Sequence, residues 1–255
     1  MQTQKNNAPV AQMTSAMLAD ARQNFVSTFS EAGALGVASN AGAAFEAAGI
    51  VVRLRSILTD QVMEAVFMPL MNTHVGFVTD RDPSKVNKKT GEIPQPYSIS
   101  VVRDSIIDAA FMGLLPTGNQ FNIISGRMYP TKEGFTALLK RIGAKYFITK
   151  TPLPDVSPSC AAVCCKVSYE YQGEKNSFTI TATVKKDGYS SMDQIKGKAE
   201  RQAKKALYEY LTGCDLGEVE DDLPAAEEQQ AQVRDAVDQK KDAMRTSETG
   251  APKLL

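Results

Sequence analysis

Apolar residues recur at helical spacing in three segments of the chain. In the segment 98–112 they fall three and four residues apart, and Gly113 follows as a residue suited to end a helix. The segment 132–142 has the same spacing and comes directly after Thr131, whose hydroxyl is suited to cap the first turn. The segment 192–211 combines this period with several alanines. We therefore predict three helices, each with one face directed at a core.

Other segments have the composition of strands. Residues 74–79 and 119–124 are short runs that contain Val, Phe or Ile. The segments 161–171 and 177–186 flank a polar stretch that contains Gly173, and this arrangement is typical of a β-hairpin. Strands and helices thus alternate along the chain. We predict an α+β fold, in which a small β-sheet is packed by helices within a single core domain.

The bounds of this core follow from changes in composition. Residues 1–48 are rich in Ala, Gln, Ser, Asn and Gly, so we expect a flexible or self-association arm, with a helix across 13–29. Residues 49–214 form the predicted core, and within it residues 50–58 fit either a strand or a short helix. Residues 215–255 are acidic and lack aromatics, so we expect a partly disordered tail.

The net charge of zero hides a strong asymmetry along the chain. Residues 1–120 carry a net charge of −1, whereas residues 121–210 hold 15 Lys/Arg against 8 Asp/Glu. The last 45 residues, 211–255, hold 5 against 11. A basic core followed by an acidic tail indicates that the core binds a polyanion such as nucleic acid.

Motifs of common enzyme families are absent from the sequence. There is no phosphate-binding loop, no dinucleotide-binding glycine pattern and no nucleophile elbow, and His74 is the one histidine. We therefore expect no enzymatic activity and no catalytic residue. Asp104 and Asp108 lie one turn apart on a predicted helix, which is typical of a solvated face more often than of a cation site.

No metal site or bound cofactor is expected, although a modulating role for Mg²⁺ stays open. The cysteines fit buried thiols better than metal ligands, because their spacing is poor for coordination. They are Cys160, Cys164, Cys165 and Cys214. No apolar run is long enough to span a bilayer, and residues 1–12 do not resemble a signal peptide, so we expect a cytoplasmic protein without a membrane partner.

The helix predicted across 192–211 carries a row of cations on the side away from its alanines. Lys198, Arg201 and Lys205 fall at spacings of three and four, and Lys204 extends this row. Few acidic residues are near enough to compensate them, so we favour phosphate binding over a merely solubilising face.

A second cluster interleaves cations with aromatic residues, a combination that suits single strands because their unstacked bases offer faces for stacking. Its predicted contact residues are Arg127, Tyr129, Lys132, Lys140, Arg141 and Lys145. Tyr146 and Phe147 alternatively begin a strand and fill the core, and for Phe147 we favour that interpretation. For Tyr129 both interpretations stay open.

The run DSIIDAAFMGLLP at 104–116 resembles a signature of the RecT family of phage single-strand annealing recombinases. An apolar strand, a turn and the helix KEGFTALLKRIG at 132–143 follow in the order of that family, and so do the hairpin, the basic helix at 196–211 and an acidic segment at 218–222. The resemblance implies a protein that binds single-stranded DNA without ATP, forms rings or helical filaments of identical subunits, and anneals complementary strands in phage recombination. Its matching basic residues are Arg127, Lys132, Lys140, Arg141, Lys198, Arg201 and Lys205.

Three further questions stay open at this point. The hairpin and the helix 196–211 also resemble the end of a double-stranded-RNA-binding domain, which reads A-form shape. A structural or adaptor protein of a phage is a second alternative, in which the arm carries the function. The acidic tail fits either a solubilising extension or a segment that masks the core or recruits a host single-strand-binding protein or phage exonuclease.

Overall fold

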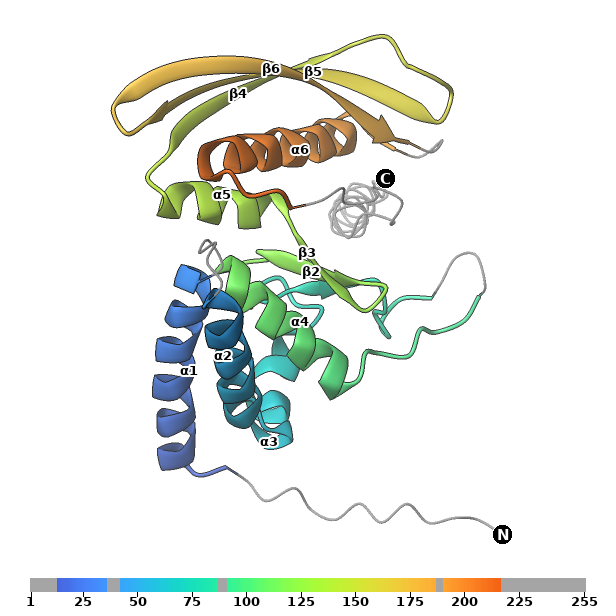
Figure 1. Cartoon of the computed structure of the whole chain (residues 1–255). Helices are drawn as coiled ribbons and strands as arrows, with labels where there is room; N and C mark the ends of the chain where they lie inside the picture. The colour runs from blue at the N-terminus through green and yellow to red at the C-terminus, as the bar shows by residue number, and fades with distance from the viewer. Residues whose placement is uncertain (1–12, 36–41, 87–90, 187–189, 217–255) are drawn as a thin grey trace, which may run out of the picture.

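The computed structural model describes residues 13–35, 42–86, 91–186 and 190–216, and within them the predicted α+β class is confirmed (Figure 1). The helices are α1 (Ser15–Leu35), α2 (Ala43–Ile57), α3 (Asp60–Val62), α4 (Ile99–Met112), α5 (Lys132–Arg141) and α6 (Met192–Thr212). A π-helical turn η1 (Met63–Phe67) and a 3-10 turn η2 (Met68–Leu70) continue α3. The strands are β1 (Val78–Thr79), β2 (Phe121–Ile124), β3 (Arg127–Pro130), β4 (Lys145–Pro152), β5 (Cys160–Tyr171) and β6 (Glu174–Lys185).

The strands form two three-stranded sheets instead of the one small sheet that we expected. In the first sheet β1 runs parallel to β2, and β2 pairs with β3 in an antiparallel hairpin. The turn of this hairpin holds Ser125 at φ 50° and Gly126 at φ 75°. Helix α4 packs against β2 and β3, and the rings of Phe77 and Phe121 stack in the core with centroids 5.3 Å apart.

Helix α1 belongs to this core, which corrects the interpretation of residues 1–48 as an arm outside it. The helix packs against α2 and α4 (Figure 1), and its Ala32 is fully buried. The ring of Phe25 lies 5.3 Å from that of Phe67. The segment 50–58, for which we left strand and helix open, belongs to α2 up to Ile57. Residues 1–12 of the predicted arm lie outside the described residues.

The second sheet is an antiparallel meander of β4, β5 and β6, and its β5–β6 hairpin confirms the one predicted from the sequence. Helix α6 covers one face of this sheet, while α5 packs on α6 (Figure 1). Ala199 and Ala203 of α6 are fully buried. Their small side chains let the helix approach the strands closely. The thiol of Cys165 lies 3.7 Å from the carbonyl oxygen of Ala199.

The ends of the predicted helices are fixed by capping residues. Thr131 accepts a hydrogen bond from the backbone N–H of Gly134, as its position before α5 predicts. Ser191 and Gln194 cap α6 reciprocally. Gly113 ends α4 in the left-handed conformation, at φ 71°. Of the predicted acidic tail, only residues 215 and 216 lie within the described part of the chain.

Candidate nucleic-acid interface

Lys198, Arg201 and Lys205 form a row on α6, which we call the α6 cation row. Each is half-buried, whereas the residues of α6 that face the sheet are fully or almost fully buried. The Lys205 Nζ lies 3.6 Å from Glu209 Oε1, and the Lys198 Nζ lies 3.5 Å from the backbone oxygen of Lys185 at the end of β6. The row therefore stands on a helix whose opposite face is fixed by packing.

Lys204 does not extend this row, and the expectation that it faces outward is wrong. Its side chain is buried, and its ammonium donates to Thr136 Oγ1 at 2.9 Å and pairs with Glu200 Oε1 at 2.7 Å. The ammonium also lies 5.8 Å from the centre of the Tyr146 ring. The physical reason is the position of α5, which covers the side of α6 on which Lys204 lies. We therefore remove Lys204 from the proposed interface.

Glu200 is held between two cations, because Lys150 of β4 pairs with its second carboxylate oxygen. Burial acts to raise the pKa of this carboxyl, but the hydrogen bonds from Lys150 and Lys204 outweigh it, so the pKa lies below its usual value of 4.5. Glu200 is thus engaged by Lys150 and Lys204 inside the fold.

Arg141 also has a structural partner. Its two terminal nitrogens donate to the backbone oxygens of Gly113 at 2.7 Å and Met112 at 2.8 Å, at the C-terminal end of α4. A cation at this end of a helix satisfies carbonyl groups that have no partner within the helix. Its neighbour Lys140 is exposed at the end of α5.

The rest of the second cluster is spread over both sheets. Arg127 is exposed at the start of β3 and Tyr129 is half-buried in the same strand. The Lys132 Nζ lies 3.7 Å from Glu133 Oε1 at the start of α5. Lys145 begins β4 in the other sheet, with its Nζ 3.4 Å from Glu170 Oε1. The structure therefore does not bring these residues into one site.

Phe147 is 70% exposed, so the expectation that it fills the core is wrong. Side chains alternate between the two faces of a strand, and Tyr146 and Ile148 take the face that packs against the core. Phe147 therefore stands on the outer face of the sheet, where Ser168 is its cross-strand partner. An exposed ring beside Lys145 keeps the combination of aromatic and cation that suits stacking of bases.

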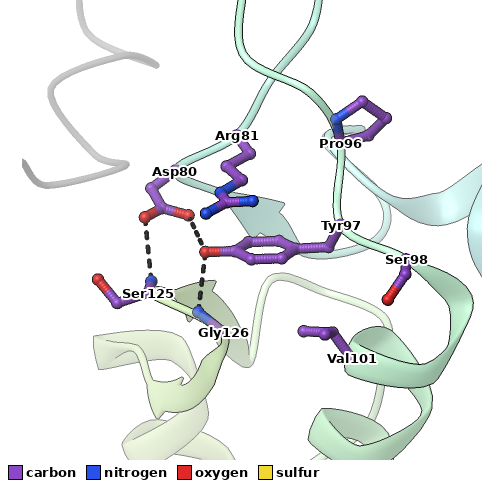
Figure 2. Close-up of a pocket in the computed structure, with 8 residues that line it drawn as sticks. All are labelled: Asp80, Arg81, Pro96, Tyr97, Ser98, Val101, Ser125 and Gly126. Carbon is purple, nitrogen blue, oxygen red and sulfur yellow. Dashed lines mark hydrogen bonds between the residues drawn. The ribbon is translucent and has the colours of Figure 1, made fainter.

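The structure also contains a pocket of about 590 Å³ that sequence reasoning missed (Figure 2). It lies between the end of β1, the start of α4 and the β2–β3 turn. Its lining residues are Asp80, Arg81, Pro96, Tyr97, Ser98, Val101, Ser125 and Gly126. No spacing in the sequence could have revealed this pocket, because Asp80 and Ser125 are 45 positions apart.

Hydrogen bonds fix one wall of the pocket (Figure 2). The Tyr97 hydroxyl donates to Asp80 Oδ1 at 2.7 Å and accepts from the backbone N–H of Gly126 at 2.8 Å. Asp80 Oδ2 accepts from the backbone N–H of Ser125 at 3.0 Å. Burial, together with the nearby Asp80 carboxylate, raises the pKa of Tyr97 to about 12. The Arg81 guanidinium lies over the Tyr97 ring, 4.7 Å from its centre.

The described residues contain no group of three potential ligands that could hold a metal ion. Asp104 pairs with Arg55 at 3.1 Å, and burial followed by the nearby Asp104 raises the pKa of Asp108. All four cysteines are free thiols, and burial raises the pKa of Cys165. Within the described ranges no helix is long and apolar enough to cross a membrane.

No model of a known protein family, no curated protein and no solved structure matches this chain. The candidate features are therefore defined by geometry alone and lie on separate surfaces. They are the α6 cation row on one side of the second sheet, the exposed Phe147 on the outer face of that sheet, and Arg127 with the pocket at the β2–β3 turn.

Proposed function

We propose that this protein binds single-stranded DNA and anneals complementary strands without ATP. The observation that carries the proposal is the α6 cation row. Lys198 and Lys205 are seven residues apart, which is about 10 Å along a helix and spans a few nucleotides of a single strand. Because α6 is packed against the sheet, binding would not have to order the helix first, and less binding energy would be lost.

Aromatic and planar side chains support the choice of a single strand over a duplex. Phe147 exposes a ring, and Arg81 lies in a pocket near Arg127. Unpaired bases offer faces to such groups, whereas the bases of a duplex are already stacked on one another. Annealing makes and breaks no covalent bond, so the proposal assigns no catalytic residue to the chain.

The proposal includes self-association and a role in phage recombination in the host cytoplasm. Rings or filaments of identical subunits would hold one strand while base pairing selects the second. A host single-strand-binding protein or a phage exonuclease would contact the tail. These parts rest on the resemblance to the RecT family and on the basic core followed by an acidic segment.

Binding of double-stranded RNA is the second candidate, and one observation favours it. Helix α6 begins with Lys196 and Lys198 in its first two turns and directly follows an antiparallel hairpin. Double-stranded-RNA-binding domains place the basic start of a helix against the phosphates of an A-form duplex.

Competition between the two nucleic acids tests the proposal. Labelled oligo(dT) bound to the protein is titrated with unlabelled single-stranded DNA, and in parallel with duplex RNA of equal length. We expect single-stranded DNA to displace the label at lower concentration. More effective displacement by duplex RNA would reverse the order of the two candidates, and absence of oligo(dT) binding at low salt would refute the proposal.

A further inference from the structure

We infer that the pocket at the β2–β3 turn holds one base of the bound strand, stacked on the guanidinium of Arg81 (Figure 2). This inference rests on the proposed binding of single-stranded DNA and assigns a specific subsite to it. It concerns a part of the molecule that lies outside α6 and that the sequence did not indicate.

Arg81 has the form of a stacking platform. One side of its guanidinium lies over the Tyr97 ring, and the residue as a whole is exposed. Among the described carboxylates, none forms an ion pair with it. A planar guanidinium stacks on aromatic rings on both of its faces, so a base can take the side that Tyr97 does not occupy.

The platform is held in place before any ligand arrives. Tyr97 is 6% exposed, and its hydroxyl is fixed between Asp80 and the N–H of Gly126. The second oxygen of Asp80 is engaged by the N–H of Ser125. Asp80 therefore connects Tyr97 to the β2–β3 turn, with one carboxylate oxygen bound to each. Little conformational freedom would be lost when a base binds.

The remaining walls suit a nucleotide unit. A volume of about 590 Å³ lies within the usual range for small-molecule pockets. Pro96 and Val101 supply apolar surface for a ring, and Ser98 adds a hydroxyl that shares a hydrogen bond with the Ser100 hydroxyl at 2.9 Å. Arg127 is exposed one residue after Gly126, so it can contact the phosphate next to the bound base.

Replacing Arg81 by Lys separates stacking from charge, because Lys keeps the charge but loses the planar group. The affinities of wild type, Arg81→Lys and the control Arg22→Lys are measured by fluorescence anisotropy. The probes are oligo(dT) and an abasic strand of equal length and equal phosphate number. Arg22 is an exposed cation on α1, away from the pocket.

We expect Arg81→Lys to bind oligo(dT) about tenfold more weakly than wild type, with Arg22→Lys unchanged. On the abasic strand, where no base can stack, Arg81→Lys should bind like wild type. Equal affinity of Arg81→Lys and wild type for oligo(dT) would overturn the inference, and so would an equal loss on both strands. Either result leaves the proposed function standing if wild type binds oligo(dT).

Photo-crosslinking to wild-type protein gives a readout that needs no variant. An oligonucleotide with 5-iododeoxyuridine should form adducts on the peptides that contain Arg81 or Tyr97. Adducts confined to other peptides would contradict the inference. Binding of free dTMP as tight as binding of oligo(dT) would also contradict it, because the pocket would then serve a mononucleotide and not a strand.

Discussion

The ammonium of Lys204 lies 2.7 Å from the carboxylate of Glu200, one turn earlier on α6, while the adjacent Lys205 pairs with Glu209 at 3.6 Å. The side chain of Lys204 is 8% exposed and that of Lys205 is 19% exposed. Lys204 also donates a hydrogen bond to Thr136 of α5 and so connects α6 to α5. Through Glu200, which pairs with Lys150, it is connected to β4 as well. Two neighbouring lysines of one helix thus have different roles.

Replacing Lys204 by Met should lower the free energy of unfolding by about 2–4 kcal/mol, because it leaves Glu200 with fewer partners in a largely buried site. The matched variant Lys205→Met, one position away, should lower it by about 0–1 kcal/mol. Urea denaturation followed by circular dichroism measures both. Equal losses would show that the buried ion pair does not stabilise the fold.

Acid should reveal the lowered pKa of Glu200. A carboxyl whose pKa is lower in the folded than in the unfolded protein stabilises the fold above the unfolded value, here 4.5, and the stabilisation is lost as the pH falls through the folded value. Below pH 4.5 the wild type should therefore lose stability more steeply than Glu200→Gln. Parallel pH curves for the two proteins would contradict the assignment.

At alkaline pH the raised pKa of Tyr97 should affect stability. Its pKa is raised from 10.0 to about 12, so between these values the folded protein keeps a proton that the unfolded chain has lost. Stability should therefore fall as the pH rises through this window, and Tyr97→Phe should lack that part of the slope. Thermal denaturation of both proteins over the window measures the difference. If Tyr97→Phe keeps the same loss of stability over this window, that loss comes from other groups.

Arg141 and Lys140 are adjacent cations with different surroundings. Arg141→Met should lower the free energy of unfolding by about 1–2 kcal/mol, since the backbone oxygens of Met112 and Gly113 lose their donors. Lys140→Met should change it little, because Lys140 is exposed. Chemical denaturation of the two variants checks this. A larger loss in Lys140→Met would contradict the described contacts.

Local signals in the sequence were sufficient for the ends of several helices. Thr131 and Gly113 act through hydrogen bonds and backbone angles within a few residues, so their roles follow from the sequence around them. The period of apolar residues likewise identified α4, α5 and α6. For the same reason the hairpin of β5 and β6 was predictable from a glycine-containing turn between two strand-like segments.

Contacts between distant segments could not be predicted. Lys204 is buried because α5 covers it, and the helical period alone does not say which side of α6 a neighbour occupies. Phe147 and Tyr146 alternate as any strand predicts, but only the position of α6 decides which of them faces inward. The pocket joins Asp80, Tyr97 and Gly126, which are brought together by the tertiary fold alone.

Annealing of two complementary oligonucleotides without ATP, followed by fluorescence quenching over a salt series, tests the central claim most directly. We expect wild type to accelerate annealing at low salt and to lose this activity as salt rises. The double variant Lys198→Gln/Arg201→Gln should lower the affinity for single strands about tenfold. The slope of log K against log salt concentration should fall by the amount expected for the loss of roughly one to two phosphate contacts. The control Arg22→Gln/Lys175→Gln, with the same change in net charge at two exposed positions away from the α6 cation row, should behave like wild type. Wild-type protein that neither binds single strands nor accelerates their annealing at low salt would contradict the account.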